Sequence, residues 1–317
     1  MSLLRKKMVL AAKLESTIGT AESLAAADAD YNVYDIEIDP EADEQSRASQ
    51  GSASKLPTTI GARMVNISFK VEMHGSGTLD TDPEWASVFL PALGFKDASN
   101  VWTPSTAAPV ASASVPRTIT IGAYHDGRLM TIAGCMGNGK FVFENGQVPY
   151  LECEMMGVYV STTDATLLAP TLPTVAPPRA ANLTFTYGGA SPGKVDRVEI
   201  DLGNEVVMRP DLATGGGTSG YCNAVIVDRN IRATMSLESA LVATFDTYGK
   251  WIAATEAAFA LDIGGATWNK LEFDAPKAQI LEPTMGDRDG IITDEIAMGF
   301  NRSAAVDDEF SLTFAAS

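Results

Sequence analysis

Two octapeptides that lie far apart in the chain share one residue pattern. Residues 78–85 read TLDTDPEW and residues 244–251 read TFDTYGKW, so Thr, Asp, Thr and Trp recur 166 residues apart (244 minus 78). The flanks agree, because Arg63 corresponds to Arg229 at the same offset. A match that continues into its flanks at a fixed offset indicates an internal repeat. We therefore expect one domain that is present twice.

Other stretches repeat at related offsets. Residues 36–39 read IEID and residues 198–201 read VEID, at an offset of 162. Met156-Gly157 and Met298-Gly299 match at an offset of 142, so the first copy holds 24 additional residues (166 minus 142), which we assign to an insertion at 96–116. The predicted organisation is an N-terminal arm (1–30), domain 1 (31–160), a Pro-rich linker (161–182) and domain 2 (183–317).

Short segments with alternating apolar and polar residues dominate both copies, which is typical of half-buried β-strands. The expected strands are 33–39, 63–73, 118–124, 129–134, 140–144 and 149–160 in the first copy, and 198–201, 230–239, 261–264, 270–274, 278–281, 291–300 and 310–314 in the second. The pattern predicts a mainly β chain with two tandem β-sandwich or barrel domains, each with one short flanking α-helix.

Each octapeptide is expected to lead into a helix. Asp82 should cap the first helix ahead of Pro83, and Thr247 should cap a second helix that runs to about residue 258. Trp85 and Trp251 could bind a ligand, but a Trp on the apolar stripe of a helix usually belongs to the core. We therefore predict both as anchors between helix and core.

Polar stretches separate the strands. Residues 41–62 and 203–226 are long and polar, with Gly215, Gly216 and Gly217 at the expected tip of the second, and residues 137–139 are expected to form a turn. Loops of that length are usually functional or disordered.

The composition limits the function. A net charge of −17 argues against a surface that grips nucleic acid, and suits either high solubility or a surface that must not adhere to DNA. The three cysteines are far apart, which favours free thiols over a disulfide framework or zinc site. Only a short apolar run, residues 8–12, follows the basic residues 5–7, so we predict neither a signal peptide nor a membrane span, and synthesis in the cytosol.

Three possible chemical sites are weak. Residues 134–140 read GCMGNGK, but Phe141 stands where a phosphate-binding loop needs Ser or Thr, and the stretch reads as a strand. His74 and His125 lie in no nucleophile motif and are expected at turns or on the surface. The acidic residues 80, 82 and 84 match no calcium-loop spacing. We predict no catalytic residue, no cofactor and no metal.

Two stretches resemble a known family. Residues 12–20, AKLESTIGT, and residues 66–77, NISFKVEMHGSG, followed by PEW at 83–85 and ALGF at 92–95, are similar to the major tail tube proteins of long-tailed, siphovirus-type bacteriophages. The resemblance is clearest over residues 10–96. It implies tail-tube-like β-sandwich or barrel domains with a flanking helix, whose inner sheets join around a lumen in stacked rings. Most such rings are hexamers of a one-domain subunit, so a duplicated chain should form a trimer with pseudo-sixfold symmetry.

The resemblance also implies a channel for DNA, which an acidic lining should repel. The candidate lining residues on the polar strand faces are Asp35, Glu37, Asp39, Glu72, Glu152, Glu154, Glu199, Asp201 and Glu238. Contacts between rings are assigned to the arm, to residues 41–62 and 203–226, and to the insertion. The implied partners are other copies of the chain, the tape-measure protein, tail-tip and terminator proteins, and double-stranded DNA in transit without specific binding. The implied location is the virion tail, with no membrane.

Two other functions remain open. Another non-enzymatic virion component, such as a tail terminator or a capsid decoration protein, would form a single ring or trimer instead of a filament. A β-sandwich carbohydrate hydrolase would need paired carboxylates and aromatic platforms. Eight Tyr and four Trp scattered singly along the chain give the hydrolase little support.

Overall fold

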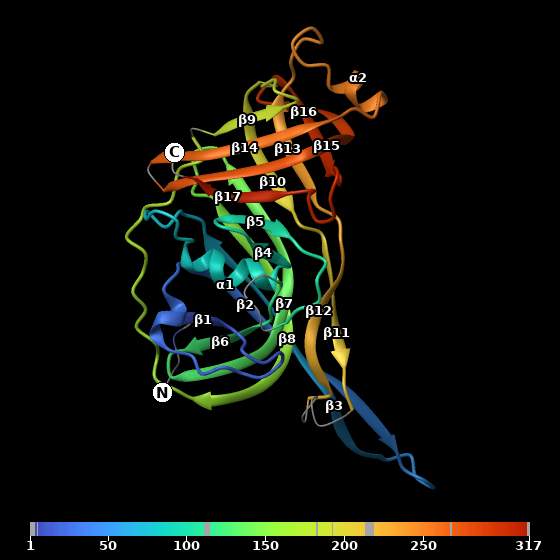
Figure 1. The fold of residues 1–317 in the computed structure, drawn as a ribbon. Coiled ribbons are helices and arrows are strands. Elements are labelled where there is room, and N and C mark those ends of the chain that lie inside the picture. The colour runs from blue at the N-terminus through green and yellow to red at the C-terminus, as the bar shows by residue number, and fades with distance from the viewer. Residues whose placement is uncertain are drawn as a thin grey trace.

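The structure is a computed structural model that describes residues 4, 6–110, 115–181, 183–191, 193–212, 219–266 and 268–315. It is mainly β, with antiparallel strands and, among the described residues, two short α-helices (Figure 1). The expectation of a mainly β fold is confirmed. The Gly-rich tip at 215–217 and the end of the chain lie outside the described residues.

The strands follow the apolar alternation that the sequence carries. Their bounds are β1 Met8–Leu14, β2 Val33–Ala48, β3 Lys55–Glu72, β4 Phe95–Asp97, β5 Val101–Pro104, β6 Ile119–His125, β7 Arg128–Glu144, β8 Tyr150–Asp164, β9 Thr184–Tyr187, β10 Val195–Asp201, β11 Asn204–Pro210, β12 Tyr221–Arg229, β13 Arg232–Glu238, β14 Glu256–Ala266, β15 Asn269–Arg288, β16 Ile291–Phe300 and β17 Ser311–Ala315. The helices are α1 Glu84–Ala92, α2 Thr247–Ile252 and the 3-10 helix Ala26–Ala29.

Fifteen of these strands form one sheet, whose main path is β2-β3-β8-β7-β10-β13-β16-β15-β17-β5-β4. β6 pairs with β7 and β1 with β6, whereas β14 pairs with β15 and β9 with β14. β11 and β12 form a separate hairpin. The path holds two successive runs of four strands, β2-β3-β8-β7 and β10-β13-β16-β15, and β7 pairs directly with β10 between them.

One apolar core extends through both halves of the chain. Phe141 and Phe143 of β7 pack against Phe273 of β15, with ring centroids 5.2 and 5.1 Å apart and the rings edge to face. Trp85 of α1 packs edge to face against Phe314 of β17 at 5.7 Å. The two runs of strands are therefore joined by side-chain packing as well as by backbone hydrogen bonds.

The expected arm and loops contain ordered strands. β1 lies inside the arm and pairs with β6, with Leu10 opposite Ala123. Residues 41–62 belong to a long β2–β3 hairpin that projects from the body of the molecule (Figure 1), and residues 203–226 contain β11 and most of β12. Residues 41–62 were predicted as a loop because the outer parts of β2 and β3 carry polar residues on both faces, whereas the apolar residues of β11 and β12 were overlooked. The outer parts of β2 and β3 are solvent-exposed, so no apolar alternation reveals them.

The two helix caps also differ from the prediction. α1 begins after Pro83 with no side-chain cap, so Asp82 does not cap it. Asp246 caps α2 by accepting a hydrogen bond from the Gly249 N–H at 2.7 Å, while the Thr247 hydroxyl lies 3.2 Å from an Asp294 carboxylate oxygen. α2 ends at Ile252, well short of residue 258, because β14 starts at Glu256.

The remaining corrections concern residues 137–139, the insertion and the linker. Gly139 lies inside β7 and not in a turn, and a Cβ atom there would come within 2.7 Å of Leu93 Cδ1, so this leucine side chain would have to shift. β4 and β5 form within the insertion, and β5 pairs with β17. The linker begins inside β8. Its described remainder, 165–181, has no helix or strand and runs along one side of the molecule (Figure 1), held by a hydrogen bond from the Thr171 N–H to Asp30 at 2.6 Å.

Candidate functional site

One face of the sheet is polar across both runs of strands. Side chains that are directly opposite each other on paired strands point to the same side of a sheet. The register gives three rows: Glu37, Ser68, Glu154 and Asn138; Lys70, Glu152, Lys140, Asp201 and Arg232; and Glu72, Tyr150, Val142, Glu199 and Thr234. We call this the polar face. The buried residues of β3, such as Ile67 and Phe69, alternate with it and face the core.

All nine candidate lining residues belong to the polar face. Asp39 is opposite Asn66, which lies on the same side of β3 as Ser68. Glu238 lies four residues after Thr234 in β13, and therefore on the same side of the sheet. Asp35 reaches the face through an irregularity in β2, where it adopts a positive φ of 53° and its carboxylate accepts a hydrogen bond from Lys70 Nζ at 3.0 Å. The strand register thus brings together residues that the sequence distributes over five strands, β2, β3, β8, β10 and β13.

Basic side chains also lie on this face, although the sequence pattern predicted only acidic ones. Lys70, Lys140 and Arg232 stand in one row with Glu152 and Asp201, and Arg197 forms an ion pair with Glu199. The hydrogen bond to Asp35 raises the pKa of Lys70. The polar face is therefore a mixed surface in which acidic groups have basic neighbours.

Two further acidic residues of this face were missed. Glu282 is opposite Ala297, which continues the row of Glu199 and Thr234, and Glu295 is opposite Ser236. The apolar alternation of residues 291–300 could have identified Glu295. Glu282 follows an irregularity in the pairing of β15 with β16, and a one-residue shift moves a side chain to the other face.

The eight-strand run β2-β3-β8-β7-β10-β13-β16-β15 has one open edge at each of its ends in the described part of the chain. β2 pairs only with β3. The pairing of β14 with β15 stops at Gln279, which is opposite Glu256, the first residue of β14. Beyond Gln279, β15 pairs only with β16. These edges lie at the two ends of the eight-strand run, and an open edge offers backbone N–H and C=O groups to another strand.

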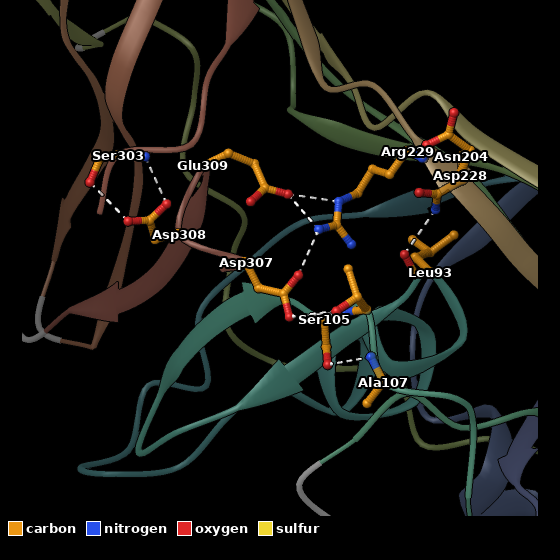
Figure 2. A network of polar contacts seen from close by, with 11 residues as sticks. Leu93, Ser105, Ala107, Asn204, Asp228, Arg229, Ser303, Asp307, Asp308 and Glu309 are labelled. Carbon is orange, nitrogen blue, oxygen red and sulfur yellow. Dashed lines mark hydrogen bonds and ion pairs between the residues drawn. The ribbon is translucent and has the colours of Figure 1, made fainter. Parts of the chain in front are cut away.

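A polar network joins the insertion to the second half of the chain (Figure 2). Arg229 Nε donates to Glu309 Oε1 at 2.8 Å, and Arg229 Nη2 lies 3.2 Å from Asp307 Oδ1. Asp307 also accepts hydrogen bonds from the backbone N–H and the hydroxyl of Thr106 at 3.0 and 3.2 Å. Arg63, which the sequence comparison matches to Arg229, instead lies over the Tyr159 ring at 5.7 Å. The two arginines therefore make different contacts.

The two predicted helix anchors differ. Trp85 is completely buried and donates a hydrogen bond from Nε1 to the His74 carbonyl at 2.8 Å. Trp251 is 43% exposed, so its prediction as a core anchor is wrong. α2 is only six residues long and its neighbours Tyr248 and Ile252 are exposed as well, because no element of the described chain covers this side of it.

The residues with possible chemistry occupy structural positions. His74 is buried, not at the surface, and its Nδ1 lies 2.7 Å from the Gly75 carbonyl oxygen. Residues 134–140 lie within β7, as the strand interpretation expected. Among the residues that the structure describes, no group of three or more His, Cys, Asp or Glu side chains could hold a metal ion, and no helix is long and apolar enough to cross a membrane.

The comparisons with known proteins agree with the resemblance. A family described as phage tail tube protein matches residues 6–306. A comparison with curated proteins finds no match. The family match spans the polar face and both open edges, and it ends just before Asp307 and Glu309, the partners of Arg229. The chain belongs to the phage tail tube protein family.

Proposed function

We propose that this chain is a structural subunit of a siphovirus-type tail that polymerises as stacked rings into a tube through which DNA passes into the host. Membership of the tail tube family supports self-assembly into a tube in the virion tail. Each ring contains three chains with pseudo-sixfold symmetry, and the polar face lines the channel. The subunit is made in the host cytoplasm, acts without catalysis, and contacts the tape-measure protein and the tail-tip and terminator proteins.

The strand register supports the repeat on which this symmetry depends. Ile38 of β2 is opposite Ile67 of β3, and Ile200 of β10 is opposite Ala233 of β13. These pairs correspond at the two offsets taken from the sequence, since 38 plus 162 is 200 and 67 plus 166 is 233. We infer that β2-β3-β8-β7 and β10-β13-β16-β15 are two copies of one unit.

The contact between β7 and β10 carries the proposal, because it indicates how subunits join. Inside the chain, the edge of the first run meets the first strand of the second run, with Phe141 opposite Ile200. The open edge of β15 occupies the same position in the second run as β7 does in the first, and β10 corresponds to β2. The open part of β15 therefore pairs with β2 of the next chain, in the antiparallel sense of β7 with β10.

The exposure of β15 fits that pairing. Phe141 is opposite Leu151, which is opposite Val71, and Met285 is opposite Asp294, which is opposite Leu237. Since Val71 and Leu237 match at the offset of 166, Met285 holds the place of Phe141. Phe141 is completely buried beneath its neighbours, whereas Met285 is 64% exposed. Burial of such a side chain stabilises an interface by about 1.5–3 kcal/mol.

Contacts between rings are proposed for the first 30 residues, the β2–β3 hairpin and residues 203–226. The projecting β2–β3 hairpin is exposed over most of residues 40–60, which suits a contact with a neighbouring ring. β4 and β5, within the insertion, pair inside the chain, so only the rest of that segment is proposed for such contacts.

Negative-stain microscopy of the purified full-length protein tests the proposal. Hollow tubes with a regular ring repeat and three chains in each ring are expected. Discrete particles at every concentration would instead favour a tail terminator or a capsid decoration protein. Rings that contain six chains would refute the proposal that pairing of β15 with β2 closes a ring of three chains.

A further inference from the structure

Segment 241–252 carries four large apolar side chains that the described fold leaves exposed. Leu241 is 80% exposed, Val242 73%, Trp251 43% and Ile252 78%. We call these four residues the α2 patch. In the first repeat the residues that correspond to Trp251 and Ile252 are Trp85 and Ala86, and both are completely buried. The same positions therefore face solvent in one repeat and the protein interior in the other.

Residues of the second repeat bury α1. Phe314 packs edge to face on Trp85 at 5.7 Å, and Asn204 Nδ2 donates to the Leu93 carbonyl at 2.9 Å. Ile226 of β12 comes so close to Gly94 that a Cβ atom there would lie 3.0 Å from Ile226 Cδ1. The unit that follows α1 along the sheet thus completes a burial to which Tyr31 and Phe69 of the first repeat also contribute by packing on Phe89. No such unit follows the second repeat in the described part of the chain.

The α2 patch lies where a following unit would arrive. α2 packs against β15, and the Thr247 hydroxyl is within 3.2 Å of Asp294 on β16. β15 is the strand with the open edge, so the patch continues the surface on which the next chain is proposed to pair. Exposed apolar clusters next to an unsatisfied strand edge are typical of interaction surfaces.

We propose that the α2 patch binds a second copy of this chain, and that the base of the second copy's β2–β3 hairpin, around Ile60, covers it. This inference rests on the proposed ring. Ile60 corresponds to Ile226 at the offset of 166, since 226 minus 166 is 60, and it is 54% exposed. Ile60 of one chain should therefore lie close to α2 of the preceding chain, just as Ile226 lies close to Gly94 at the end of α1. The contact is head to tail, with a different surface on each partner, as a closed ring requires.

A buried Trp at the centre of an interface is commonly a residue on which binding depends strongly. Trp251→Glu and, separately, Ile60→Asp should each weaken association of the purified protein by about thirtyfold or more. Both side chains are exposed in the single chain, so the melting temperature should not change when it is measured below the concentration at which the wild type assembles. Leu172→Glu is the matched control, because Leu172 is 55% exposed on the segment that joins the repeats and should leave assembly unchanged.

Mixing the two variants gives the decisive measurement, by size-exclusion chromatography with light scattering. Each variant alone should remain a monomer. An equimolar mixture should form a one-to-one dimer and nothing larger, because only one intact patch can meet one intact hairpin. Normal tubes from Trp251→Glu, or no dimer in the mixture, would overturn the inference.

The wild-type protein separates this inference from the proposed function. If the wild type forms tubes and Trp251→Glu does as well, the α2 patch is not the interface, although the tube proposal stands. If the wild type forms neither rings nor tubes, the proposed function fails, and the inference fails with it.

Discussion

Replacement of Arg229 by Met tests whether the network in Figure 2 holds the two halves of the chain together. The Arg229 side chain is 12% exposed, and its partners Asp307 and Glu309 are 7% and 14% exposed. Met keeps most of the side-chain volume and removes the charge. The two carboxylates would then share a nearly dry site without a cation.

The expected loss is about 3 kcal/mol, the lower end of the range for removing one partner of a buried ion pair. The lower end applies because Asp307 keeps its two hydrogen bonds from Thr106. The matched control is Lys277→Met, which removes a pair of similar length, 3.0 Å to Glu256, whose side chains are 42% and 38% exposed. Such an exposed pair contributes about 0–1 kcal/mol.

Urea unfolding of the monomer, followed by tryptophan fluorescence, measures the difference. With an m-value of about 3 kcal/mol/M, the loss moves the midpoint by about 1 M. A triple variant that adds Asp307→Asn and Glu309→Gln to Arg229→Met removes the uncompensated charges and should recover most of the stability. An Arg229→Met midpoint that coincides with that of Lys277→Met would refute the reasoning, because it would mean that solvent screens the network.

Three other predictions follow from single residues. Burial raises the pKa of Asp82 from 3.8 to about 6, so the carboxyl lowers stability as the pH rises through that window. Asp82→Asn should therefore raise the free energy of unfolding by about 1–2 kcal/mol above about pH 7, a figure reduced to allow for the partial exposure of the side chain. Below about pH 4 it should have no effect, and thermal melts at the two pH values measure the difference. Gly139→Val places a Cβ 2.7 Å from Leu93 Cδ1 and should cost about 1–3 kcal/mol in urea unfolding, whereas Gly265→Val, with no atom within 4 Å, should not destabilise through a clash. Glu154 is directly opposite the uncharged Ser68 and Asn138, so Glu154→Lys should leave tubes intact under negative stain but lower infectivity about tenfold. Normal infectivity would remove DNA repulsion as the explanation for the acidic residues of the polar face.

Local pattern was sufficient for many of the strands with a buried face, although β1, β9 and β12 were missed. Residues 291–300 were predicted as a strand and coincide with β16, because alternate residues such as Ile296 and Met298 are buried. The same reasoning missed the outer half of the β2–β3 hairpin. Its backbone is paired, but its side chains are exposed on both faces, so burial does not select apolar residues there.

The nine candidate lining residues lie on strands of the polar face, and their role as a channel lining stays a prediction, but their basic neighbours were not predicted. Lys140 and Arg232 reach the row of Glu152 and Asp201 only through pairing between strands that are distant in sequence. The register of such pairs depends on side-chain packing across the sheet and on irregularities such as the one in β2 at Asp35, which shift pairing by a residue. A single sequence without its partner strands does not specify them.

The sequence by itself determined the mainly β class and many of the strands with one buried face. It also predicted a repeat, and two of its three offsets, 162 and 166, agree with the strand register. These features depend on local alternation and on matches within the chain. Only the tertiary structure decided the different surroundings of the two tryptophans. Trp85 is buried because the second half of the chain packs over α1, whereas Trp251 has no following unit to cover it. Burial of a helix face depends on what lies beside it in space, and the octapeptide pattern contains no information about that neighbour.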